Sequence, residues 1–143
     1  MRGQLPSSAL ALYAGVGGID VVGEAHYRDG IDRVVAGPYA GGVRAIYWAQ
    51  LVPEADNPYD ANAVAARING EHAGYLSKSD AKQYRPILED LTAAGRQAAV
   101  RCDVWYGWNR PGAERGNYSL RVYMDSPKRQ VELLGREGVP LAS

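Results

Sequence analysis

The sequence predicts a mainly β domain of the α+β class, built as a small OB-like antiparallel barrel with two or three short flanking helices. Several short stretches rich in β-branched residues alternate with turn signals, which is typical of antiparallel folds. One of them, residues 43–52, is apolar on both faces, so we expect a strand covered on both sides, as in a closed barrel. A chain of 143 residues has room for one such domain.

The predicted strands form consecutive hairpins. Asn69-Gly70 is the strongest hairpin signal, because this pair favours a type I′ turn. Pro53 ends the long strand, and the loop from Glu54 to Asn62 is polar and rich in turn residues. The expected strands are 19–23, 43–52, 63–68, 71–76, 97–105 and 118–124, the last two joined by a Gly-rich loop at 107–116.

Helices are predicted between these strands. Apolar residues recur at helical spacing from 27 to 35, and Gly37-Pro38 ends that short helix. A second helix begins at a capping residue, Ser77 or Ser79. Because proline lacks an N–H group, Pro86 is expected to break this segment and open a third helix that runs through Ala94.

The two ends of the chain are expected to lie outside the domain. Residues 1–18 form a loose lead segment, 19–126 the domain, and 127–143 a poorly ordered tail. Residues 8–22 make a weak secretory signal because three glycines and Asp20 interrupt them. No apolar run reaches the roughly 20 residues that a membrane span needs.

The single cysteine, Cys102, cannot form an internal disulfide, so a reducing, cytoplasmic location is expected. The alternation around it predicts a small buried side chain on a strand. The 16 basic and 16 acidic residues give a net charge of zero, which argues against a protein that coats duplex DNA by charge alone. Only the last third of the chain carries a small basic excess.

One string of residues is unusually specific. The sequence LVPEADNPYDANAV at 51–64, followed by Gly74-Tyr75-Leu76-Ser77-Lys78, closely resembles the HIRAN domain. The upstream VGEAHY at 22–27 is similar to the first-strand motif of that family. HIRAN domains occur in the helicase-like transcription factor and in bacterial proteins. The resemblance implies an OB-like barrel, a role in DNA processing or repair, and a helicase or another DNA-processing protein as partner.

In eukaryotic members this domain captures the 3′-hydroxyl end of single-stranded DNA. By motif position, the resemblance implies that Asp60 accepts a hydrogen bond from the terminal hydroxyl, assisted by the backbone of Tyr59. It also implies that Asn57 contacts the terminal nucleotide, that Tyr27 stacks on a base, and that Lys78 holds a phosphate.

This chain departs from the family pattern in three places. An arginine and two aromatic residues in the family correspond to Ala25-His26-Tyr27 in this chain. One phosphate contact and one stacking ring are therefore missing or replaced, and His26 can stack on a base or donate a hydrogen bond only more weakly. The glycine-histidine pair that faces a phosphate corresponds to Gly74-Tyr75, and a short helix replaces the loop after Tyr27.

The residues themselves leave two interpretations of the Asn57–Asp60 loop open. Its Asn and Asp side chains can cap their own backbone and do nothing else. Alternatively, a carboxylate that repels phosphate suits a ligand offering a hydroxyl, as a strand end does. Tyr27 can stack on a base or pack in the core, and Lys78 can meet a phosphate or stay solvated.

The last hairpin interleaves basic and aromatic residues, a mixture that suits single-stranded nucleic acid. Trp105 is expected to pack on the barrel, so only Trp108 and Arg110 at the loop join the candidate site.

Catalysis is not expected, and neither is a cofactor. The chain has two histidines and one cysteine, without any paired metal-ligand spacing. Two alternatives to DNA binding remain: a protein-interaction or adaptor domain with a degenerate pocket, and a metal-dependent nuclease that would use Glu54, Asp56 and Asp60.

Overall fold

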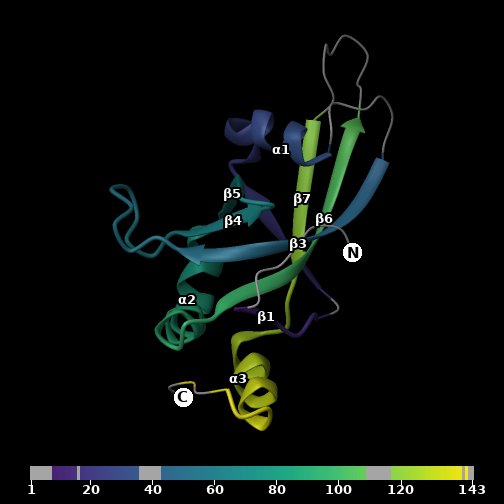
Figure 1. Cartoon of the computed structure of the whole chain (residues 1–143). Coiled ribbons are helices and arrows are strands. Elements are labelled where there is room, and N and C mark those ends of the chain that lie inside the picture. Colours follow the sequence, from purple (N-terminus) through teal and green to yellow (C-terminus); the bar gives the residue numbers. More distant parts are fainter. Residues whose placement is uncertain (1–7, 16, 36–42, 109–116, 140, 142–143) are drawn as a thin grey trace.

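The computed structural model describes residues 8–15, 17–35, 43–108, 117–139 and 141. Six strands close into an antiparallel barrel, in the order β6-β3-β4-β5-β2-β7 and back to β6, which confirms the predicted fold class (Figure 1). They are β2 (Gly18–Val22), β3 (Val43–Pro53), β4 (Val64–Ile68), β5 (Glu71–Leu76), β6 (Gln97–Trp108) and β7 (Asn117–Tyr123).

The two long strands, β3 and β6, form the backbone of the barrel. They pair antiparallel from Val43 opposite Tyr106 to Leu51 opposite Ala98. The face of β3 that carries Tyr47 and Leu51 is buried, whereas Ile46 on the other face is only half-buried. One face of β3 therefore supplies the core, and the prediction that both faces would be covered alike was wrong: the outer face is only partly covered.

The turn between β4 and β5 is the predicted hairpin. Asn69 has a φ of 51° and Gly70 a φ of 80°, as a type I′ turn requires. The register shifts once, between Ala66 and Arg67, which interrupts the regular ladder of this hairpin.

The predicted loose lead was wrong for residues 9–11. These residues form β1 (Ala9–Ala11), which pairs in parallel with the start of β6, and the amide of Leu12 donates to the carbonyl of Ala99. The next side chain, Leu12, joins the core. Three small or apolar residues are too short a pattern to predict a strand. The strand that stabilises them lies about 88 positions away in the sequence, so no local signal reveals the pairing.

The predicted poorly ordered tail was also wrong. Residues Pro127–Arg136 form α3, with Ser126 as its N-cap and Pro127 in its first turn. Leu134 is fully buried, and the buried Gln130 donates from Nε2 to the carbonyl of Tyr13 at 2.7 Å. The 19–126 bounds of the domain stay a prediction, although residues on both sides of them join the core.

A short helical segment follows β2, as predicted. It consists of a 3-10 turn, η1 (Glu24–Tyr27), and α1 (Arg28–Val35). Ile31 of α1 is buried. The guanidinium of Arg33, on the same helix, pairs with Glu71 on β5 at 2.9 Å. The predicted end of this helix at Gly37-Pro38 lies outside the described residues.

The helical region after β5 is one helix, α2 (Lys78–Ala93), so the predicted break at Pro86 was wrong. Ser77 caps α2, since its hydroxyl accepts from the amide of Asp80. Pro86 is exposed, and the buried stripe that includes Leu88 and Leu91 continues past it. Burial of this stripe against the barrel outweighs the backbone hydrogen bond that proline removes.

Two smaller expectations concern Cys102 and the membrane. Cys102 is fully buried on β6, which confirms the predicted small core side chain. Of the helices that the structure describes, none has the length and apolar character to cross a bilayer.

Candidate functional site

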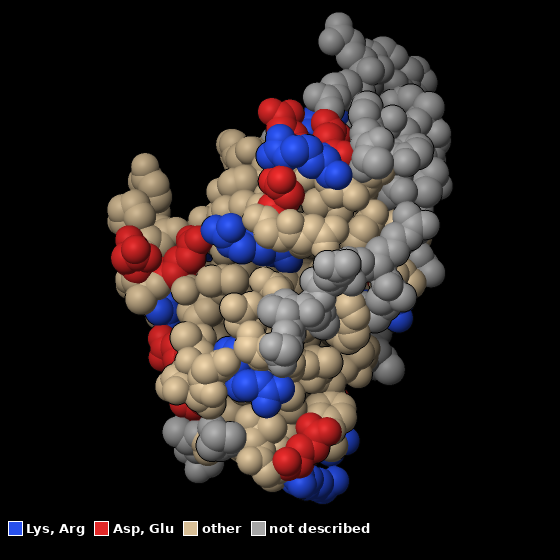
Figure 2. Space-filling view, in the orientation of Figure 1, with Lys and Arg blue, Asp and Glu red and all other residues tan. Residues whose placement is uncertain are grey.

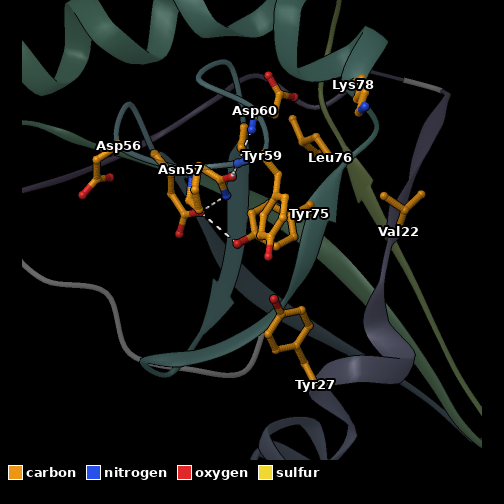
Figure 3. Close-up of a pocket in the computed structure, with 12 residues that line it drawn as sticks. Val22, Tyr27, Asp56, Asn57, Tyr59, Asp60, Tyr75, Leu76 and Lys78 are labelled. Carbon is orange, nitrogen blue, oxygen red and sulfur yellow. Dashed lines mark hydrogen bonds between the residues drawn. The ribbon is translucent and has the colours of Figure 1, made fainter.

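An open pocket of about 640 Å³ lies where the end of β2, η1, the loop after β3, the end of β5 and the start of α2 meet (Figure 3). It is lined by Val22, Tyr27, Glu54, Asp56, Asn57, Pro58, Tyr59, Asp60, Ala63, Tyr75, Leu76 and Lys78. Six of the nine candidate residues predicted from the sequence therefore lie around one cavity. Whether they bind a ligand stays a prediction.

The loop after β3 is held by its own side chains. Asn57 Oδ1 accepts from the backbone amides of Tyr59 at 2.9 Å and Asp60 at 3.1 Å. Asp60 Oδ1 accepts from the amide of Asn62 at 2.9 Å, and the amide of Glu54 donates to the carbonyl of Ala63 at 2.8 Å. The self-capped loop foreseen from the residues is thus present, and it gives the pocket wall a fixed shape.

Self-capping and ligand binding are compatible at Asp60. Only one oxygen of its carboxylate caps the loop, and among the described residues no donor reaches the other. The amide of Tyr59 is occupied by Asn57, so the backbone of Tyr59 has only its carbonyl left for a ligand. The side chain of Tyr59 is 94% exposed at the rim of the pocket.

Glu54 connects this loop to the barrel. Its Oε1 accepts from the hydroxyl of Tyr75 at 2.8 Å and from Nδ2 of Asn57 at 3.1 Å. Burial raises the pKa of the Tyr75 hydroxyl, and hydrogen bonds with Glu54 and Tyr27 raise it further. Since Tyr75 has a single O–H and donates it to a carboxylate, it does not face a phosphate in the way a histidine at this position could.

Glu54 was missed as a binding-site residue, because the sequence suggested it only as one of three carboxylates for a metal. Its place three residues before Asn57 in a turn-rich loop was the available signal. Within the described ranges, no group of three or more His, Cys, Asp or Glu side chains is arranged to hold a metal ion, and this holds for Glu54, Asp56 and Asp60.

Three rings meet behind and beside the pocket. Tyr27 on η1 stacks on His72 of β5, with ring centroids 4.0 Å apart and planes 20° apart. Tyr75 lies 4.8 Å from His72 in an edge-on arrangement, and Tyr27 points toward Tyr75 in Figure 3. Desolvation, followed by the charge of Arg67, lowers the pKa of His72, so its ring is neutral at neutral pH.

His72 carried no signal in the sequence beyond being one of two histidines. Only folding brings it against Tyr27, 45 positions earlier in the chain. The packing role of Tyr27 considered from the sequence is therefore real, yet the same ring also lines the pocket.

Lys78 is the first residue of α2 and lines the pocket with an exposed side chain. Among the residues that the structure describes, no carboxylate pairs with it. The N-terminus of α2 adds partial positive charge at the same edge. Figure 3 shows Lys78 and Asp56 on opposite sides of Asp60, so the pocket has a basic end and an acidic end.

The remaining candidates do not join this group. His26 is exposed and does not line the pocket. Trp108 ends β6, but its side chain is outside the description, and Arg110 lies outside the described residues altogether. On the face seen in Figure 2, basic and acidic side chains are interspersed instead of forming one basic patch.

Fold and site together define a small closed antiparallel barrel with an open pocket of tyrosines and carboxylates beside a helix N-terminus. No family model matches the sequence, and no curated protein matches it. Among solved structures, the chain is similar to the crystal structure of the HIRAN domain of human HLTF, at 18% sequence identity and a TM-score of 0.41. The alignment covers 89% of this chain and 92% of that one.

Proposed function

We propose that this chain is a noncatalytic module that binds single-stranded DNA and takes the 3′-hydroxyl end into the pocket beside Asp60. The observation that carries the proposal is the carboxylate oxygen of Asp60 that the loop leaves unused, within a pocket that also presents Tyr27 and Lys78. A carboxylate oxygen accepts a hydrogen bond from a hydroxyl and repels a phosphate.

The rest of the pocket suits a short stretch of single strand. An exposed tyrosine ring can stack on a base, worth about 1–3 kcal/mol per base. The exposed Tyr59 on the rim and the half-buried Tyr27 on the wall support this part of the proposal. Lys78 and the N-terminal amides of α2 provide the place for a backbone phosphate.

The charge of the pocket limits the affinity. Glu54, Asp56 and Asp60 line it against one lysine, so few phosphates are neutralised when a strand binds. We therefore expect modest affinity and a shallow dependence of log K on log salt, with a slope of about −0.7 for one neutralised phosphate of a single strand.

Fluorescence anisotropy with a labelled oligothymidylate at low salt tests the proposal. The oligonucleotide with a free 3′-hydroxyl should bind more tightly than the same strand with a 3′-phosphate. Asp60→Asn should weaken binding of the hydroxyl end about tenfold, the loss expected from one hydrogen bond to a charged acceptor. Asp56→Asn removes the same charge from the same pocket without removing the proposed acceptor, so it should keep the preference for the hydroxyl end.

Equal binding of both ends, or no binding at low salt, would overturn the proposal. A pull-down would then test an adaptor function. A protein partner that still binds the Asp60→Ala, Tyr27→Ala double variant would favour it. The resemblance at 51–64 makes a helicase or another DNA-processing protein the first partner to test.

A further inference from the structure

We infer that His72 is a positioning residue for this site: it backs the ring of Tyr27, so that a nucleobase stacks on a ring that is already held in place. The inference rests on the proposed function, and it assigns a role to a side chain that does not itself line the pocket.

The geometry of the stack supports this role. The rings of Tyr27 and His72 lie 4.0 Å apart and within 20° of parallel. Tyr27 lines the pocket and His72 does not, so His72 supports one face of the tyrosine ring from outside the pocket. A bound base would extend the stack to three rings, in the order His72, Tyr27, base.

The imidazole is itself fixed by the barrel. His72 Nε2 lies 3.1 Å from the carbonyl oxygen of Gly74, and because a carbonyl only accepts, Nε2 carries the hydrogen. The ring of Tyr75 meets His72 at 4.8 Å with its plane at 65°. Since His72 belongs to β5, which pairs with β4, the support of Tyr27 is tied to the barrel wall.

Burial favours the neutral form of His72 most strongly, by lowering its pKa, and the charged groups around the ring act in both directions. Arg67 on β4 opposes its protonation, Glu54 after β3 favours it, and Glu71 beside it is paired with Arg33 of α1. A neutral imidazole supports Tyr27 by offering a flat face for stacking. A phenyl ring, which has no nitrogen, should therefore support Tyr27 equally well.

A held ring binds more tightly than a mobile one. Fixing a rotamer-rich side chain on binding costs about 0.5–1.5 kcal/mol, which corresponds to a 2- to 12-fold change in affinity. Because Tyr27 is ordered before a ligand arrives, this cost is removed from the binding step.

The test compares three substitutions in the full chain by anisotropy with the oligothymidylate that has a free 3′-hydroxyl. His72→Ala should weaken binding about 2- to 12-fold, and His72→Phe should restore it because phenylalanine keeps a flat ring. His72→Leu retains volume without a stacking face, so it should resemble His72→Ala. In a Tyr27→Ala background, none of the three should have a further effect.

A second measurement does not depend on DNA. With labelled tyrosines assigned through Tyr27→Phe, the ring protons of Tyr27 should show a ring-current shift that His72→Leu removes and His72→Phe keeps. If the wild type binds no DNA while this pattern holds, the proposed function fails but the support of Tyr27 stands. If the shift is unchanged in His72→Leu, or if the wild type binds DNA and His72→Phe binds no better than His72→Ala, the inference is wrong.

Discussion

The hydroxyl of Tyr75 on β5 donates to Oε1 of Glu54 at 2.8 Å, and the same oxygen accepts from the side-chain amide of Asn57. This one carboxylate oxygen therefore connects the barrel wall to the loop that carries Asp60. The loop is short and polar, and none of its residues from 54 to 62 is buried, so hydrogen bonds set its position.

We predict that Tyr75→Phe lowers the free energy of unfolding by about 1–2 kcal/mol. A hydrogen bond to a charged group contributes about 1.5–3 kcal/mol, and partial exposure of this pair reduces that value. Urea unfolding followed by tryptophan fluorescence measures the change. In a double-mutant cycle with Glu54→Gln, the two losses should not add. Full additivity would mean that the two side chains are not coupled.

Pro86 offers a test of how tertiary burial sustains α2. Because proline in a helix interior removes one backbone hydrogen bond and crowds the preceding turn, Pro86→Ala should stabilise the protein by about 1–3 kcal/mol. Thermal unfolding should show a higher Tm. Gln83→Ala, at another exposed position of the helix, serves as the control and should change little. A lower Tm for Pro86→Ala would show that the proline ring makes a contact that outweighs its helical cost.

Cys102 should be unreactive in the native protein. Burial, together with the nearby charge of Asp103, raises the pKa of its thiol to about 12. At a pH near 8, an aromatic disulfide reagent should label almost none of the native protein and one thiol per chain after denaturation in guanidinium chloride. Rapid labelling without denaturant would contradict the buried position of Cys102 on β6.

Acid should destabilise the protein through His72. The pKa of His72 is lowered in the folded state from 6.5, mainly by desolvation, so the unfolded chain binds a proton more readily. Stability is thus complete above about pH 6.5 and falls as the pH drops from there toward the folded pKa. Urea unfolding between about pH 7.5 and 5.5 should show this loss in the wild type and less of it in His72→Phe. Identical slopes for the two proteins would exclude His72 as the group responsible.

Local patterns in the sequence were enough for most of the barrel. The turn at Asn69-Gly70 depends on two adjacent residues that tolerate positive φ, so it could be predicted without any partner. The loop that Asn57 and Asp60 cap likewise follows from side chains that bond to nearby backbone. Each of these features is decided by interactions within a few residues.

Tertiary structure decided the remainder, because long-range burial and pairing outweigh local preference. Pro86 stays in one helix since its neighbours pack on the barrel, and Ala9–Ala11 becomes a strand only beside β6. The sequence by itself determined a small barrel and the loop after its long strand, whose residues resemble the HIRAN motif. Only closure of the barrel brought His72 against Tyr27 and Glu54 into contact with Tyr75. Contacts between segments distant in the sequence leave no local pattern from which they could be predicted.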